Sequence, residues 1–94
     1  MAKVEIYTTA FCPYCVRAKR LLDRKGVPYR EVAVDHDSEQ MRLMMARSQR
    51  RTVPQIFIDD RPVGGFDDIA ALDAGGELDA LLGLAPTFDP DPPT

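Results

Sequence analysis

The alternation of apolar and polar residues along the chain predicts a series of short strands. Val4–Thr8 alternates β-prone residues with polar ones and predicts the first strand. Tyr29–Val34 and Val53–Asp59 predict two more, the second of them buried, with Ile56 and Ile58 on one face and Phe57 on the other. Pro62–Gly64 follows a tight turn and predicts a fourth, which its proline places at a sheet edge or a strand start.

Helical spacing of apolar residues predicts helices between and after these strands. A helix over roughly 13–25 opens at Pro13, ends before Gly26 and has its apolar side at Cys15, Ala18, Leu21 and Leu22. A second stripe follows the capping residue Asp37 and is expected to pack in the core; it consists of Met41, Met44, Met45 and Ser48. Phe66–Ala74 predicts a third helix, and one or two further turns follow at Leu78, Leu81 and Leu82.

The order of these elements predicts an α/β fold with one mixed sheet. The first strand–helix–strand unit requires parallel strands with a right-handed crossover, while the tight turn makes the last two strands antiparallel. Helices then cover both faces of the sheet. We expect one domain over 1–84, followed by a Pro-rich tail over 85–94 that is disordered or extended.

Composition and charge exclude several classes of protein. Apolar residues make up 45% and charged residues 29% of the 94 residues, which is typical of a globular domain. The chain has no apolar run of membrane-spanning length and no signal-peptide pattern, so we expect a cytoplasmic protein without membrane contact. The net charge of −3 argues against nucleic-acid binding. The charge is uneven: residues 1–51 hold eleven basic and six acidic residues, and residues 52–94 hold one and nine.

Cys12-Pro13-Tyr14-Cys15 carries the chemistry. Two cysteines three residues apart at a helix start, directly after a strand, form the redox arrangement. The unpaired N–H groups and the dipole of the helix favour a thiolate at Cys12, and a lower thiol pKa raises its reactivity. Cys15 lies almost one turn later and deeper, so we expect Cys12 to attack a disulfide and Cys15 to resolve the product.

Two other interpretations of the cysteine pair remain. A structural zinc site within the chain would need more ligands than the two thiols and His36, which we interpret as a solvated loop residue. Two inert core cysteines are the other alternative, and the Pro-Tyr pair at a helix start argues against it. We expect no metal site.

Three further segments accompany the cysteine motif in a fixed order. They are Val4-Glu5-Ile6-Tyr7-Thr8, Thr52-Val53-Pro54-Gln55-Ile56-Phe57-Ile58 and Gly64-Gly65-Phe66-Asp67-Asp68. With them, residues 3 to about 83 closely resemble the glutaredoxins of the bacterial dithiol class. The resemblance implies a thioredoxin fold, with a four-stranded mixed sheet flanked by three or more helices, and a cis peptide at Val53–Pro54.

The resemblance also implies a glutathione site beside the dithiol. Val53 would pair with the tripeptide backbone as a strand does, and the helix start at Phe66 and Asp67 would bind the γ-glutamyl carboxylate. Asp67 or Asp68 would pair with the ammonium group. The predicted glutathione-binding residues are Tyr14, Arg51, Thr52, Val53, Pro54, Gly65, Phe66, Asp67 and Asp68, with Arg50 as the alternative to Arg51 at the glycine end.

The chain departs from the family at Thr9, where glutaredoxins often carry a lysine that stabilises the thiolate and meets a glutathione carboxylate. Our hypothesis is that Arg50 and Arg51 compensate. Gln49 stands where glycine is common, and we expect a local effect.

The predicted function is that of a glutathione-dependent thiol–disulfide oxidoreductase, which reduces protein disulfides and glutathione mixed disulfides through Cys12 and Cys15. Its expected partners are glutathione, disulfide-containing or glutathionylated proteins (ribonucleotide reductase among the candidates) and, indirectly, glutathione reductase; we expect a monomer. One alternative is a redoxin reduced by thioredoxin reductase that serves ribonucleotide reductase. Another is an iron–sulfur cluster carrier in which Cys12 and glutathione hold the cluster between two protomers.

Overall fold

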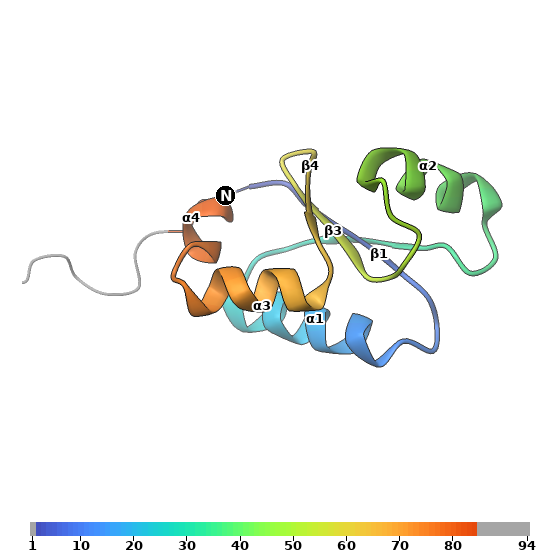
Figure 1. Cartoon of the computed structure of the whole chain (residues 1–94). Coiled ribbons are helices and arrows are strands. Elements are labelled where there is room, and N and C mark those ends of the chain that lie inside the picture. The colour runs from blue at the N-terminus through green and yellow to red at the C-terminus, as the bar shows by residue number, and fades with distance from the viewer. Residues whose placement is uncertain (1, 85–94) are drawn as a thin grey trace, which may run out of the picture.

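A four-stranded mixed sheet forms the centre of the protein (Figure 1). The structure, a computed structural model, describes residues 2–84. The sheet has the order β2-β1-β3-β4. Strand β1 (Val4–Thr8) runs parallel to β2 (Arg30–Ala33) and antiparallel to β3 (Gln55–Ile58), which pairs antiparallel with β4 (Arg61–Gly64). The mixed sheet predicted from the connections is therefore confirmed, and β4, with its proline, lies at an edge.

The helices divide between the two faces of the sheet (Figure 1). Helices α1 (Pro13–Lys25) and α3 (Phe66–Ala74) lie side by side on one face, and α2 (Ser38–Ser48) covers the other. The short helix α4 (Leu78–Leu81) closes the end of the molecule at which the chain begins. The bounds predicted for α1 and α3 are confirmed. The tail predicted over 85–94 lies outside the described residues.

Two strands are shorter than predicted, and for β3 the reason is local. Strand β3 begins at Gln55 instead of Val53, because Pro54 has no N–H to donate to a ladder. It ends before Asp59 and Asp60, whose φ values of 52° and 68° form the turn into β4. Strand β2 loses one residue at each end relative to the predicted Tyr29–Val34.

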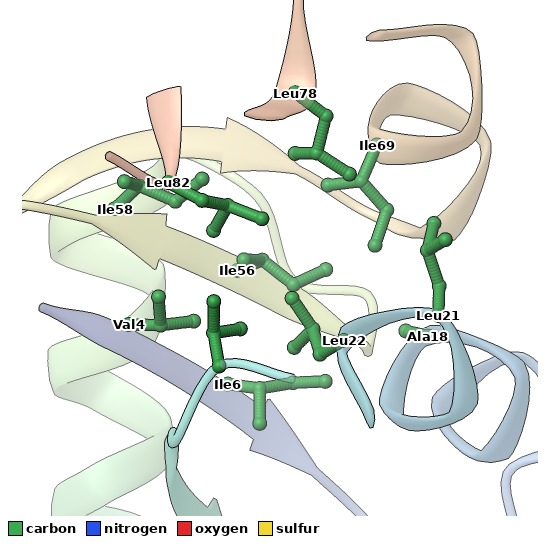
Figure 2. Close-up of a cluster of buried hydrophobic side chains, with 11 residues drawn as sticks. Val4, Ile6, Ala18, Leu21, Leu22, Ile56, Ile58, Ile69, Leu78 and Leu82 are labelled. Carbon is green, nitrogen blue, oxygen red and sulfur yellow. The ribbon is translucent and has the colours of Figure 1, made fainter. Parts of the chain in front are cut away.

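Alternation along β1 and β3 divides the core into two layers. Figure 2 shows the layer beneath α1 and α3, in which Ile6, Leu22 and Ile56 are fully buried. It consists of Val4, Ile6, Ala18, Leu21, Leu22, Val27, Ile56, Ile58, Ile69, Leu78 and Leu82. The layer beneath α2 consists of Tyr7, Val32, Val34, Met44 and Phe57, with Met41 and Met45 packed against it. The methionines thus pack in the core, as predicted.

Helix caps explain where α1 and α2 begin and end. Helix α1 ends at Gly26, whose φ of 72° is left-handed. The Asp37 carboxylate accepts a hydrogen bond from the N–H of Gln40 at the start of α2, which confirms the predicted cap. Helix α2 ends at Gln49, which adopts a left-handed φ of 61° without being glycine.

Candidate functional site

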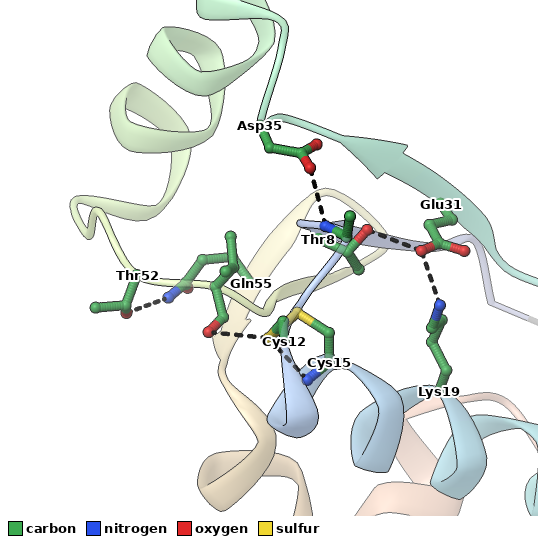
Figure 3. The surroundings of a disulfide bond; sticks show 10 residues. Thr8, Cys12, Cys15, Lys19, Glu31, Asp35, Thr52 and Gln55 are labelled. Carbon is green, nitrogen blue, oxygen red and sulfur yellow. Dashed lines mark hydrogen bonds and ion pairs between the residues drawn. A yellow bond between two sulfur atoms is a disulfide. The ribbon is translucent and has the colours of Figure 1, made fainter.

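The start of α1 places the two cysteines against each other. Cys12 is the N-cap residue, and its Sγ accepts a hydrogen bond from the N–H of Cys15 at 3.0 Å. Pro13 occupies the first helical position, where its missing N–H leaves no donor unpaired. The Cα atoms of Cys12 and Cys15 are 5.1 Å apart, and their sulfurs form a disulfide (Figure 3). The pair is therefore placed to exchange two electrons between a dithiol and a disulfide.

Burial distinguishes the two cysteines. Cys15 is 2% exposed, whereas Cys12 is only partly buried and lies at the surface end of the helix. The Sγ of Cys12 also lies 3.9 Å from the carbonyl oxygen of Val53, which belongs to the loop before β3. The Val53–Pro54 peptide is cis, as the resemblance implied. Cys12 is thus the cysteine that an incoming molecule can reach, and the loop at Val53 faces it.

A groove of about 200 Å³ lies beside the dithiol. Tyr14 and Phe66 form one wall, with their ring centroids 6.3 Å apart. Its lining comes from α1, from the loop before β3 and from the first turn of α3; the residues are Tyr14, Arg50, Thr52, Val53, Pro54, Gln55, Gly65, Phe66, Asp67 and Asp68. The groove thus joins three segments that are far apart in the sequence.

The glycines of the third motif allow the close approach of α3 to this groove. Gly64 has a φ of 107°, and a Cβ on it would clash with the carboxyl group of Asp68. A Cβ on Gly65 would lie 3.2 Å from the carbonyl oxygen of Pro54. Gly64 therefore has no room for a side chain and Gly65 has little, and this close packing brings the unpaired N–H groups of the α3 N-terminus to the groove.

Asp68 has two internal partners at this end of the groove. Its Oδ2 accepts a hydrogen bond from the N–H of Gly65 at 2.8 Å and forms an ion pair with Nη1 of Arg50 at 3.0 Å. The Gly65 hydrogen bond, followed by the Arg50 contact, lowers the pKa of the Asp68 carboxyl group below its ordinary value. Asp68 is therefore a fixed negative charge at neutral pH.

The structure brings together all but one of the residues predicted for glutathione binding. The exception is Arg51, which lies outside the groove and lines a separate hollow with Met45, Gln49 and Arg50. Arg50, the alternative, lines the groove. Gln55 also lines it but was not predicted as a site residue. It is 1% exposed, and its side chain donates to the hydroxyl of Thr52 at 3.2 Å. A polar residue within a buried strand is the signal that would have indicated it.

Two carboxylates hold the strand and loop that lead to Cys12 (Figure 3). Glu31 accepts from the hydroxyl of Thr8 at 2.8 Å and from Lys19 at 2.9 Å, and Lys19 followed by Thr8 lowers its pKa. Asp35 accepts from the N–H of Ala10 at 3.0 Å, and this backbone hydrogen bond lowers its pKa. Strand β2 and the loop after it therefore determine where the cysteine loop lies.

Residues 2–84 contain no group of three or more His, Cys, Asp or Glu side chains placed to hold a metal ion. Within the same range, no helix is long and apolar enough to span a bilayer.

A strand–Cys-x-x-Cys–helix unit on this sheet, with the dithiol beside a peptide-sized groove, defines a thiol–disulfide oxidoreductase of the thioredoxin fold. The glutaredoxin family model matches residues 4–63, more than half of the chain. The sequence is 56% identical over 82 residues to glutaredoxin 3 of Escherichia coli, covering 87% of this chain and 99% of that protein. The chain belongs to the glutaredoxin family.

Solved structures agree with this assignment. The solution structure of a glutaredoxin from Brucella melitensis matches with a TM-score of 0.77 at 50% identity, covering 87% of this chain and 89% of that one. A crystal structure of a buckwheat glutaredoxin–glutathione complex matches with a TM-score of 0.80 at 26% identity, covering 89% and 83%. The predicted thioredoxin fold is confirmed, and the protein is a glutathione-dependent dithiol oxidoreductase with Cys12 and Cys15 as its redox pair.

Proposed function

We propose that Cys12 is the attacking thiol and Cys15 the resolving thiol of this oxidoreductase. The observation that carries the assignment is the pair of contacts of the partly buried Cys12 Sγ, which accepts from the N–H of Cys15 and lies 3.9 Å from the carbonyl oxygen of Val53, a residue that lines the groove. In the reduced protein the same N–H and the positive end of α1 stabilise a thiolate at Cys12. Cys15 is buried, so it reacts with a disulfide only after Cys12 has formed one.

The reaction with a protein disulfide consists of two exchanges. The Cys12 thiolate attacks one substrate sulfur, forms a mixed disulfide and releases the other substrate sulfur as a thiolate. The thiol of Cys15 loses its proton and attacks Cys12 Sγ, which forms the Cys12–Cys15 disulfide and releases the reduced substrate. Two glutathione molecules then return the pair to the dithiol and leave as glutathione disulfide, which glutathione reductase recycles.

A glutathionylated protein needs only Cys12. The thiolate attacks the glutathione sulfur, the protein thiolate leaves, and a second glutathione releases the first as glutathione disulfide. We assign glutathione to the groove. The Phe66 and Asp67 N–H groups would bind its γ-glutamyl carboxylate, Asp68 its ammonium, the Val53 backbone its central residue and Arg50 its glycine carboxylate.

This chemistry requires a supply of reduced glutathione, and we place the protein in the cytoplasm for that reason. The protein substrates we propose are disulfide-containing and glutathionylated proteins, and ribonucleotide reductase is one candidate to test. The buckwheat relative was crystallised with glutathione, and this supports glutathione as the ligand of the groove.

The first test separates the reductants. A mixed disulfide of glutathione and 2-mercaptoethanol is supplied, and NADPH oxidation is followed with glutathione plus glutathione reductase, or with thioredoxin reductase alone. We expect turnover only in the first case. Turnover only in the second would contradict the glutathione site and favour a redoxin of the thioredoxin-reductase type.

The second test assigns the two thiols. Cys12→Ser should abolish reduction of both a protein disulfide and the mixed disulfide, because the attacking atom is lost. Cys15→Ser should abolish only the reduction of protein disulfides. Complete loss of mixed-disulfide reduction in Cys15→Ser would overturn the assignment.

A further inference from the structure

Exposed apolar side chains of the described residues gather around the dithiol. Only four large hydrophobic residues between 2 and 84 are markedly exposed, and three of them lie within the segment 11–16. Phe11 is 98% exposed, Tyr14 52% and Val16 42%. The fourth, Leu43, is 46% exposed and lies on α2, on the opposite face of the sheet. A fully exposed phenylalanine contributes nothing to the core, so its place beside Cys12 needs another explanation.

Phe11 and Val16 lie outside the groove and next to Cys12. Phe11 directly precedes Cys12 in the chain, and neither residue lines the groove. Val16 follows Cys12 by four residues, and its N–H donates to the Cys12 carbonyl oxygen at 3.1 Å, so both lie along one stripe of the helix. We call Phe11 and Val16 the apolar rim. Tyr14 belongs instead to the groove wall with Phe66.

A cation borders the same surface. The guanidinium of Arg17 lies 5.3 Å from the centre of the Tyr14 ring. No carboxylate of the described residues lies within ion-pair distance of Arg17. Two other charged groups near the cysteine loop already have partners: Lys19 pairs with Glu31, and Asp35 accepts from the N–H of Ala10. Arg17 is therefore a cation beside Tyr14 that is available to a carboxylate of another molecule.

We propose that the apolar rim and Arg17 form the docking surface for the protein part of a glutathionylated substrate. The preferred partner is a protein whose modified cysteine lies in an exposed segment with an apolar residue and a carboxylate beside it. The inference rests on the proposed glutathione groove, because glutathione would fill that groove and leave no room there for the rest of the substrate.

The geometry of disulfide exchange supports this division of the surface. When the Cys12 thiolate attacks the glutathione sulfur, the protein sulfur is displaced as a thiolate on the far side of the glutathione sulfur. The segment that carries it must therefore approach Cys12 from outside the groove. Phe11 and Val16 offer that segment apolar area, and Arg17 offers a charge that a carboxylate can reach.

The experiment compares a small substrate with two peptides. The small substrate is the mixed disulfide of glutathione with 2-mercaptoethanol. The peptides carry a glutathionylated cysteine followed by leucine, and they differ only in whether the next residues are glutamate or lysine. The value of kcat/KM is measured for the wild type, Phe11→Ser, Arg17→Gln and Leu43→Ser. Leu43→Ser is the control, since it removes an exposed apolar side chain on α2, across the sheet from the helix that carries the dithiol.

Phe11→Ser should lower kcat/KM about 10-fold for both peptides, because an aromatic anchor is lost. The kcat/KM for the small substrate should stay within about 2-fold of the wild-type value. Arg17→Gln should reduce the preference for the glutamate peptide over the lysine peptide. The ratio of the two kcat/KM values does not depend on the reactivity of the Cys12 thiolate, because the same thiolate attacks both peptides. Leu43→Ser should match the wild type throughout.

Several outcomes overturn the inference. Equal losses on the small substrate and the peptides in Phe11→Ser would show that Phe11 supports the cysteine loop. Unchanged peptide kinetics, or an unchanged peptide ratio in Arg17→Gln, would show that the surface does not bind the protein part. A wild type that fails on the small substrate as well would refute the proposed function itself, which separates the two failures.

Discussion

Nη1 of Arg50 and Oδ2 of Asp68 lie 3.0 Å apart and form an ion pair at the groove beside Cys12. The two residues come from different segments, the loop after α2 and the first turn of α3. Both side chains are about half exposed, at 52% and 43%, so the pair adds little to stability. We propose that its charges serve the ligand, and that glutathione exchanges the internal contact for contacts with its own charged ends.

Arg50 and Arg51 provide a matched pair of variants for this assignment. Arg50→Gln should raise the KM for the glutathione mixed disulfide about 5-fold, because a charge-assisted contact at a partly exposed site is worth about 1 kcal/mol. Arg51→Gln should change it less than about 2-fold, because Arg51 does not line the groove. Steady-state kinetics with each variant measure both effects. A larger effect at Arg51 would restore the assignment that sequence reasoning favoured.

The Glu31 carboxylate predicts how stability depends on pH. Lys19 and Thr8 lower its pKa below the ordinary value of 4.5, so the folded protein binds the proton less readily than the unfolded chain. The contribution of Glu31 to the free energy of unfolding is therefore complete above pH 4.5, and it is lost as the pH falls through the lowered pKa. Urea unfolding between pH 3 and 6 should show a shallower decline for Glu31→Gln than for the wild type.

A control for this pH dependence is Glu39→Gln, which removes an exposed carboxylate that lies 3.9 Å from Arg42. Its free energy of unfolding should decline with falling pH as steeply as that of the wild type, since such a surface ion pair contributes little to stability. If Glu31→Gln declined as steeply as the wild type, the Thr8–Glu31–Lys19 contacts would not be coupled to folding.

Replacing Gln49 by glycine is expected to stabilise the protein. The Gln49 φ of 61° is left-handed, a conformation that costs a non-glycine residue about 1 kcal/mol. Gln49→Gly should therefore raise the free energy of unfolding by about 0.5–1 kcal/mol, measured by urea denaturation. The contrast is Asp60→Gly, at a φ of 68°, where the gain is offset by the loss of ion pairs with Lys3 and Arg47. Equal stabilisation by both would show that the Asp60 ion pairs contribute nothing.

Arg47 is expected to stabilise the α2 side of the sheet. It donates to Glu5 at 3.0 Å and to the Tyr7 hydroxyl at 2.7 Å, and its guanidinium lies 4.0 Å from the centre of the Phe57 ring. Glu5 is 7% exposed. Arg47→Met should lower the free energy of unfolding by about 2 kcal/mol, because it removes one partner of a buried carboxylate, which still pairs with Arg30 at 3.0 Å.

The same reasoning predicts a partial rescue. Glu5→Gln in the Arg47→Met background should recover about 1 kcal/mol, since the neutral amide is less costly to bury. Arg42→Met, which removes an exposed ion pair with Glu39, should cost less than about 0.5 kcal/mol. If Arg42→Met lowered the free energy of unfolding as much as Arg47→Met, burial of the carboxylate would not explain the effect of Arg47.

Local features of the sequence were sufficient for most of the fold and for the reactive thiols. Proline at a helix start, glycine after its end and apolar residues at helical spacing act within a few residues, so they predicted α1 from Pro13 to Lys25. Alternation along the predicted strand 53–59 placed Phe57 on the face opposite Ile56 and Ile58. The spacing of Cys12 and Cys15 on that helix predicted a dithiol, because three residues make almost one turn.

Contacts between distant segments were decided by the tertiary structure alone. Arg50 and Arg51 are neighbours of the same type, and only the packing of α3 against the loop before β3 determines that Arg50 meets Asp68 and lines the groove. The pairing of Glu31 with Thr8 and Lys19 likewise depends on how three elements come together. Local propensity carries no information on such contacts, because they arise from the relative placement of whole elements.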